Sequence, residues 1–197
     1  MNSLPTILLF EPRILIRTGL AAYLMDAGHP VVVCLSAEQL TEAICLQTER
    51  PRILLIGAGG LGESLFKIVR MLYFAQKLSL KSLVYLPRHD GLLTRLFISA
   101  GALQCLTQDG LESGILPLLL NAEVPHRRAQ RFSPSELNVL ISYASGLQTS
   151  EIAVRRNCHV KTVYAFKLKI CSRLEIETKN NWLELITRLA QLKSFYE

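Results

Sequence analysis

The chain has 197 residues, half of them hydrophobic, so it is long enough to bury one or two cores and too apolar to be disordered. No apolar run reaches the roughly 18 to 20 residues of a membrane span, and charges at positions 11, 13 and 17 break up the apolar N-terminus, so we expect no membrane helix and no signal peptide. The formal net charge of +6 lies entirely in the residues from Pro125 onward, which hold 12 Lys+Arg and 6 Asp+Glu, whereas the preceding residues hold 10 of each.

Residues 1–122 alternate short apolar runs with segments of helical periodicity. Strands are expected at Thr6–Phe10, Val31–Leu35, Ile53–Ile56, Ser82–Leu86 and Gln104–Thr107. Helices are expected at Ile14–Ala27, Glu38–Thr48, Ser64–Leu78, Leu92–Ser99 and Leu111–Leu120. Continuous apolar strands that alternate with helices are typical of a parallel sheet covered on both faces. This size and order predict a flavodoxin-like α/β domain.

A glycine-rich turn follows the third expected strand. Gly57-Ala58-Gly59-Gly60-Leu61-Gly62 fits the G-x-G-x-x-G pattern that lets a backbone approach a pyrophosphate. The strand is the third rather than the first, and no acidic residue lies between Glu63 and Asp90 to bind a ribose. We therefore expect a structural or partner-facing turn and no cofactor. A nucleotide-binding sensor that uses this turn is a less favoured alternative.

The five cysteines are odd in number, scattered and never in Cys-x-x-Cys spacing. They are Cys34, Cys45, Cys105, Cys158 and Cys171. This pattern argues against a disulfide framework and against a zinc site, so no metal is expected. Reduced cysteines that act as small apolar residues are typical of a cytoplasmic protein.

Residues 132–197 follow a linker expected at 123–131 and have the pattern of a four-helix all-α domain. Ser133-Pro134-Ser135-Glu136 is a capping box with Pro at the first helical position, and Gly146 ends that helix. Further helices are expected at Glu151–Arg156, Val160–Leu174 and Lys179–Leu192. Two short helices joined by a tight turn, the second of them basic, suit a helix-turn-helix that enters the major groove of DNA. The basic charge of this part supports nucleic-acid binding independently.

Many residues of this part agree in order and spacing with a known family. They are Phe132, Ser133, Glu136, Val139, Leu140, Gly146, Glu151-Ile152-Ala153, Lys161-Thr162-Val163, Ile170 and Arg173-Leu174. On these residues the last third of the chain resembles the LuxR/FixJ (NarL-type) transcriptional regulators. Three positions depart from the family pattern: His159 stands at a usual Ser N-cap, Arg156 at a usually buried Leu, and Phe166 at a frequent His.

The resemblance implies which residues of the third helix meet DNA. The candidates are Lys161, Thr162, Tyr164, Ala165, Lys167, Leu168, Lys169 and Arg173. Lys161 and Thr162 would hold the phosphate backbone, and Tyr164, Ala165 and Leu168 would occupy base-reading positions. Ala and Leu can contact only thymine methyl groups, so the reading face is poor in bidentate donors.

The N-terminal domain is similar to the receiver domain of response regulators. The matching segments are Ile7–Phe10 with Arg17–Leu20, Pro51–Ile56, and Gly101-Ala102 before Cys105-Leu106. The resemblance implies a phosphate site, and its residues are missing. Glu11 and Pro12 stand at the acid pair, Gly57 at the phosphoacceptor, Leu86 at the hydroxyl and Gln108 at the lysine. We expect a pseudo-receiver that does not accept phosphate.

The two resemblances together predict a non-enzymatic, cytoplasmic transcription regulator of a bacterium that binds double-stranded DNA as a dimer. Asn157–Tyr164 also resembles regulators of fimbriae and capsule, which implies control of surface structures. A dimer is expected because such regulators bind two half-sites, and the last helix often pairs in this family. The alternative is an auxiliary protein that forms a heterodimer with another response regulator.

Overall fold

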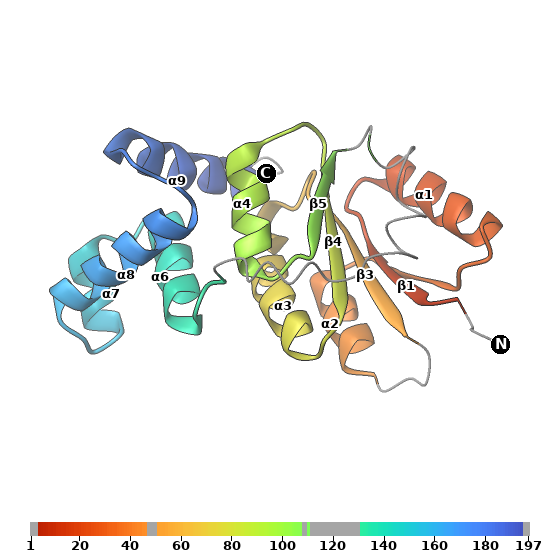
Figure 1. Cartoon of the computed structure of the whole chain (residues 1–197), viewed down its shortest axis with the longest axis horizontal. Coiled ribbons are helices and arrows are strands. Elements are labelled where there is room, and N and C mark those ends of the chain that lie inside the picture. Colours follow the sequence, from red (N-terminus) through yellow and green to blue (C-terminus); the bar gives the residue numbers. More distant parts are fainter. Residues whose placement is uncertain (1–3, 47–50, 108–109, 111–130, 195–197) are drawn as a thin grey trace.

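The computed structural model describes residues 4–46, 51–107, 110 and 131–194 (Figure 1). The predicted helix at 111–120, Gln108 and residues 123–130 of the predicted linker lie outside them. The first part is a parallel sheet in the order β2-β1-β3-β4-β5 with helices on both faces. The second part is the helical domain, formed by α6 to α9. Among the described helices, none is long and apolar enough to span a bilayer.

The strands and helices follow the predicted order. The strands are β1 (Thr6–Phe10), β2 (Val31–Cys34), β3 (Arg52–Gly57), β4 (Lys81–Leu86) and β5 (Gln104–Thr107). The helices around the sheet are α1 (Ile14–Asp26), α2 (Ala37–Cys45), the short 3₁₀ helix η1 (Gly62–Ser64), α3 (Leu65–Lys77) and α4 (Gly91–Ala100). The helical domain contains α6 (Pro134–Ala144), α7 (Thr149–Arg155), α8 (Val160–Arg173) and α9 (Lys179–Ser194). The parallel five-stranded sheet predicted from the sequence is confirmed.

Helix α2 ends three residues before its predicted end. The side chain of Arg52, at the start of β3, donates through Nη1 to the carbonyls of Ala43 and Ile44 at 2.7 and 3.2 Å. Carbonyls of a last helical turn lack partners within the helix, so this arginine satisfies them from outside. Leu46 then adopts an extended conformation. A contact from a distant strand is invisible to helical periodicity, which explains the difference.

Alternate residues of each strand point to opposite faces of the sheet. One face presents Ile7, Leu9, Ile53, Leu55, Leu83 and Tyr85, which pack with Ala21 and Leu24 of α1. The other face presents Leu8, Phe10, Leu54, Ile56, Val84 and Leu86, which pack with α2, α3 and α4. In Figure 1, α1 lies on one side of the sheet, and α2, α3 and α4 lie on the other.

The second of these cores continues into the helical domain. Phe132 is buried, and its backbone N–H donates to the carbonyl of Ser99 in α4 at 2.9 Å. Buried residues of α6, α8 and α9, such as Leu140, Ile170 and Leu185, belong to the same hydrophobic cluster as the sheet residues. Figure 1 shows α4 standing between the sheet and the helical domain. Apolar packing therefore fixes the helical domain against α4.

Candidate functional sites

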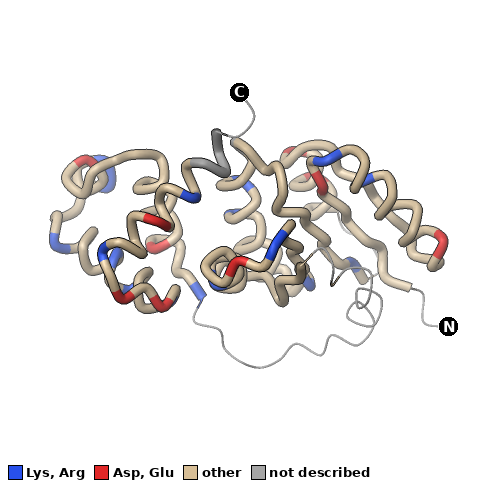
Figure 2. The backbone as a smooth tube through the Cα atoms, turned by 90° about the horizontal axis from the view of Figure 1, so that it is seen from above, with Lys and Arg blue, Asp and Glu red and all other residues tan. Residues whose placement is uncertain are grey.

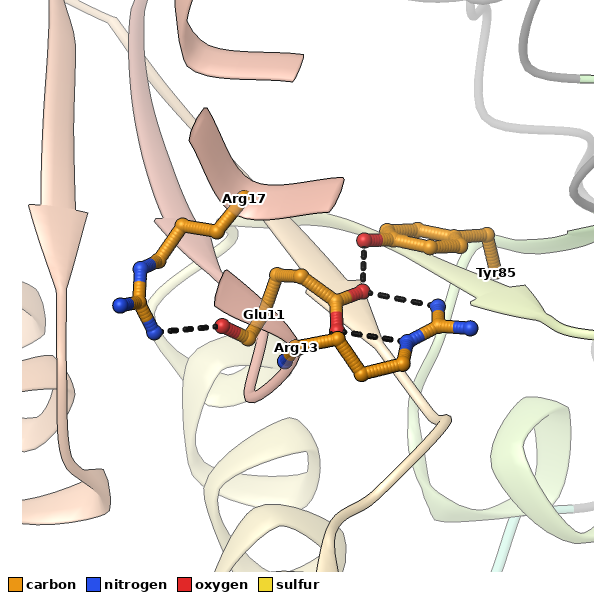
Figure 3. A network of polar contacts seen from close by, with 4 residues as sticks. All are labelled: Glu11, Arg13, Arg17 and Tyr85. Atoms are coloured by element: carbon orange, nitrogen blue, oxygen red, sulfur yellow. Dashed lines mark hydrogen bonds and ion pairs between the residues drawn. The ribbon is translucent and has the colours of Figure 1, made fainter. Parts of the chain in front are cut away.

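A closed polar network occupies the carboxyl edge of the sheet, where β1, β3 and β4 end (Figure 3). The carboxylate of Glu11 is fully buried and accepts at Oε1 from the backbone N–H of Arg13 (2.7 Å) and from its Nε (2.9 Å). Its Oε2 accepts from Nη2 of Arg13 (3.0 Å) and from the hydroxyl of Tyr85. Arg17 donates to the backbone carbonyl of Glu11 at 3.1 Å. The network pairs one buried carboxylate with one guanidinium and one phenol.

The protonation states in this network follow from burial and contact. Burial, together with the hydrogen bond to Glu11, raises the pKa of Tyr85, so the phenol stays protonated and acts as the donor. The hydrogen bonds to Glu11 raise the pKa of Arg13 despite its partial burial. A buried carboxylate is stable only where donors satisfy it, and here Arg13 and Tyr85 supply them.

The network fills the space beside Gly57, the position that the sequence resemblance alone aligned with a receiver's phosphoacceptor. A Cβ atom at Gly57 would lie 2.0 Å from Oε2 of Glu11 and 2.7 Å from the hydroxyl of Tyr85. No residue with a side chain fits there unless Glu11 moves. The sequence pattern pointed to Leu86 for a receiver's hydroxyl position and did not single out Tyr85. The register of β3 and β4 places Tyr85 opposite Gly57, and its hydroxyl donates to Glu11. A tyrosine in the apolar second half of β4 was the available signal.

Backbone conformation and close contacts within the chain both require glycines in the turn at 57–62. Gly60 and Gly62 have positive φ angles of 76° and 51°, a region that favours glycine. A Cβ at Gly59 would lie 2.7 Å from the guanidinium carbon of Arg13. The turn then leads into η1, which packs against α9 of the helical domain. Close approach of side chains at Gly57 and Gly59 and the positive φ of Gly62 give each glycine of the G-x-G-x-x-G pattern a role within the chain.

Side-chain caps lie at the starts of the helices of the helical domain, and three of them bear on the helix-turn-helix. Ser133 and Glu136 form the predicted capping box at α6. Gln148 and Glu151 form a second one, which starts α7 at Thr149, two residues before the predicted start. At α8, Nδ1 of His159 accepts from the backbone N–H of Lys161 at 3.2 Å. His159 therefore caps α8 at the turn between α7 and α8.

The outward face of α8 carries most of the predicted DNA-contacting residues. Lys161, Thr162, Tyr164, Ala165, Leu168 and Lys169 are all exposed. Val163 and Ile170 of the same helix are buried in the domain's core. Residues 131–194 hold 10 Lys+Arg and 5 Asp+Glu, and Figure 2 shows these charges distributed over the helical domain. The structure thus brings six of the eight predicted residues onto one accessible surface.

The other two predicted residues make contacts within the chain. Arg173 donates through Nε and Nη2 to the two carboxylate oxygens of Glu136, at 3.0 and 3.2 Å. Lys167 lies over the rings of Trp182 and Tyr143, with its Nζ 4.8 and 5.7 Å from their centroids. These contacts give Arg173 and Lys167 partners within the chain, and the prediction that they contact DNA stays a prediction.

The apolar face of helix α9 packs against other residues of the same chain. Trp182, Leu185 and Leu189 are at most 4% exposed, and Trp182 packs edge-on against Tyr143 with ring centroids 5.3 Å apart. Near its described end, Arg188 pairs with Asp90, the N-cap of α4, at 2.5 Å. On the same side of α4, Arg95 donates to the carbonyl of Leu174 at 2.8 Å. Residues around these contacts line a cleft of about 410 Å³ between α4 and the start of α9.

Asp90 has two roles, an N-cap and an ion pair, that different substitutions can separate. Its carboxylate accepts from the backbone N–H groups of Leu92 and Leu93 as the N-cap of α4, and it pairs with Arg188. We expect Asp90→Asn, which keeps the cap, to lower the free energy of unfolding by up to about 1 kcal/mol. Asp90→Ala should cost about 1 kcal/mol more because the cap is lost as well. Urea unfolding at low and high salt measures both.

A comparison of unfolding at low and high salt separates the contribution of the ion pair with Arg188 from that of the N-cap. The deficit of Asp90→Asn should shrink at high salt, since the pair is partly exposed, whereas the difference between the Asn and Ala variants should persist. Arg188→Met serves as the matched control for the ion pair. Equal stability of the Asn and Ala variants would contradict the cap assignment.

The fold, a parallel five-stranded sheet with helices followed by a helical domain, is similar to that of solved response regulators. Solved structures similar to this chain include RcsB from Salmonella enterica serovar Typhimurium bound to the promoter rprA with the phosphomimetic BeF3−, at 17% identity and a TM-score of 0.54. Two RcsB dimers bound to two parallel DNAs are similar at 18% identity and a TM-score of 0.51. The response regulator StyR is similar at 22% identity and a TM-score of 0.49. Each match covers 93% of this chain and 98% of the other. No family model and no curated protein matches the chain.

Proposed function

We propose that this chain is a non-enzymatic, sequence-specific DNA-binding transcription regulator of the bacterial cytoplasm, with α7 and α8 as its helix-turn-helix. The observation that carries the proposal is the outward face of α8, where Lys161, Tyr164, Ala165 and Leu168 are exposed together at helical spacing. The LuxR-type resemblance of the last third of the chain supports it. Promoter DNA bound to the structurally similar RcsB supports it further. Control of surface structures is the corresponding pathway proposal.

We propose that this regulator works without phosphorylation. The acceptor position holds Gly57, and the carboxylate of Glu11 fills the adjoining space with Arg13 and Tyr85 as its partners. Mass spectrometry of the protein after incubation with acetyl phosphate tests this. No acyl phosphate should form, and incorporation at any Asp would overturn the proposal.

We propose further that the regulator binds DNA as a homodimer through α1. This helix leaves Ile14, Leu15, Tyr23 and Met25 45 to 87% exposed on the part of the sheet domain remote from the helical domain. A second copy of the chain is the occupant that an inverted DNA repeat requires. The RcsB dimers on DNA support this arrangement. A heterodimer with another response regulator is the second candidate, favoured by the same exposed apolar face.

Selection from a random double-stranded DNA library by the purified full-length chain tests these proposals. Enrichment of an inverted repeat supports a homodimeric, sequence-specific regulator and provides its operator. Enrichment of a half-site alone favours the heterodimer. Failure to enrich any sequence, combined with weak salt-sensitive binding to all DNA, would contradict sequence-specific regulation.

Lys161 should contribute through phosphate rather than base contact. We expect Lys161→Ala to weaken binding to every sequence and to reduce the slope of log affinity against log salt concentration by about 0.9, the value for one phosphate contact. Lys77→Ala, which removes an exposed lysine of α3 in the sheet domain, is the control and should leave the slope unchanged. Fluorescence anisotropy over a salt series measures both. An unchanged slope for Lys161→Ala would defeat the assignment.

A further inference from the structure

The accessible surface of α8 has an apolar centre. Tyr164 and Leu168 are 54 and 56% exposed, and Ala165 lies exposed between them. Their spacing of i, i+1 and i+4 places them on one side of the helix. Val160, at the first turn, is 46% exposed. Large apolar side chains cost free energy when they face water, so a stripe of them at the middle of the proposed reading helix calls for a ligand that covers it.

Three cations near this stripe, Arg156, Lys167 and Arg173, have partners within the chain. Guanine is read best by a bidentate Arg or Lys at its O6 and N7 atoms. The guanidinium of Arg173 is held by Glu136, and the ammonium of Lys167 lies over Trp182. Arg156 of the helix-turn-helix donates to the hydroxyl of Ser135 at 3.2 Å. Folding thus withdraws three cations from the reading surface.

The cations that stay exposed on α8 border the apolar stripe. Lys161 and Lys169 are exposed, and α8 contains no Asp or Glu. A surface with an apolar centre, basic edges and no carboxylate is complementary to a groove with apolar groups on its floor and phosphates along its rims. The major groove of DNA over A·T pairs fits this description, because the C5 methyl of thymine is the apolar group exposed there.

We propose that α8 recognises DNA chiefly through thymine methyl groups, with Ala165 and Leu168 as the specificity-determining contacts and Lys161 and Lys169 on the flanking phosphates. This inference rests on the proposed function and names the chemistry that its operator must have. The operator half-site should contain at least two thymines whose methyls lie in the groove facing α8. Tyr164 adds an apolar ring edge and a single hydroxyl donor.

Uracil tests this directly, because deoxyuridine differs from thymidine only by lacking the C5 methyl. The operator obtained by selection is synthesised with thymine, and again with uracil at each half-site thymine in turn. We expect binding by the full-length chain to weaken about fourfold for each methyl lost at a contacted position, the factor that burying one such group supplies. The salt dependence of binding should stay the same, since no phosphate contact is changed.

A cycle of protein and DNA substitutions assigns the contact to its residue. Leu168→Ala should weaken binding to the thymine operator and abolish most of the preference for thymine over uracil at one position. Lys161→Ala, the matched control, should weaken binding to both operators equally and keep the preference. Far-UV circular dichroism confirms that both exposed-site variants fold.

The outcomes are distinct. A thymine preference that Leu168→Ala removes supports the inference. Sequence-specific binding that is indifferent to uracil overturns the methyl readout and leaves the regulator intact. A preference that survives in Leu168→Ala and Ala165→Gly overturns the assignment to these residues. No binding to any duplex overturns the proposed function, and the inference with it.

Discussion

Arg173→Met should lower the free energy of unfolding of the helical domain by about 3–5 kcal/mol at neutral pH, the cost of leaving one member of a buried ion pair alone. Glu136 is only 2% exposed, and its two oxygens accept from the guanidinium of Arg173 and from the backbone N–H of Ser133. Without Arg173 the carboxylate keeps one donor. Urea unfolding monitored by Trp182, the chain's only tryptophan, measures the loss within this domain.

The pH dependence of this loss has a definite sign. Burial opposes ionisation of Glu136, but the hydrogen bonds from Ser133 and Arg173 prevail and lower its pKa. The wild-type carboxylate therefore adds stability above its unfolded pKa of about 4.3, and this stability disappears as the pH falls through the lower folded value. In Arg173→Met the pKa of Glu136 should be higher than in the wild type, because the hydrogen bond and the charge of Arg173 no longer lower it. The deficit of the variant should then be largest near pH 7 and shrink as the pH falls toward 4.

Lys169→Met is the control, because Lys169 is an exposed cation on the same helix. Its free energy of unfolding should stay within about 0.5 kcal/mol of the wild type, as for most surface substitutions. Equal effects of the two substitutions would show that Arg173 does not support Glu136.

The sequence predicted the order of the sheet domain well because each strand is an uninterrupted apolar run. The segment at 53–56, for example, is buried on both faces of β3, so each of its residues is hydrophobic. Capping signals were equally direct, and the box at Ser133 and Glu136 is present as predicted. Local interactions of this kind depend on residues three or four positions apart, so they can be recognised without the fold.

Roles that depend on distant partners could not be predicted in this way. The sequence offers Arg173 as a phosphate contact. In the fold its guanidinium pairs with Glu136, which lies 37 residues away in the chain. Lys167 was predicted to contact DNA beside the reading face. In the fold its ammonium lies over the ring of Trp182 in the next helix. Tertiary partners decide which of these cations are held within the chain, whereas the sequence shows only their charge.

The polar network at the carboxyl edge illustrates the same limit. The sequence showed that Gly57 cannot accept phosphate, but it did not show what replaces the missing chemistry. The answer requires the register of β3 and β4, which places Tyr85 opposite Gly57 and within reach of Glu11. The carboxylate of Glu11, paired with the guanidinium of Arg13, thus fills the space beside Gly57.

Substitutions at Glu11 and Gly57 should be strongly coupled. Gly57→Ala should destabilise the chain by about 3 kcal/mol or more, because the new methyl would lie 2.0 Å from Oε2 of Glu11 and must break the buried pair with Arg13. Glu11→Ala should cost about 3 kcal/mol, because Arg13 and Tyr85 lose their buried acceptor. In the double variant the methyl enters the space that the carboxylate vacated. Its deficit should be smaller than the sum of the single deficits by about 2 kcal/mol.

Gly19→Ala is the control for the effect of a methyl alone. A Cβ at Gly19 meets nothing within 4 Å, and the residue lies inside α1, so this substitution should stabilise the chain by roughly 0.5–1 kcal/mol. Urea unfolding followed by far-UV circular dichroism measures all four variants. Additive effects at Glu11 and Gly57 would mean that the carboxylate does not fill the acceptor position. If they are coupled as expected, then Gly57→Asp alone cannot restore an acceptor, because the new side chain would meet the same carboxylate of Glu11 that excludes alanine.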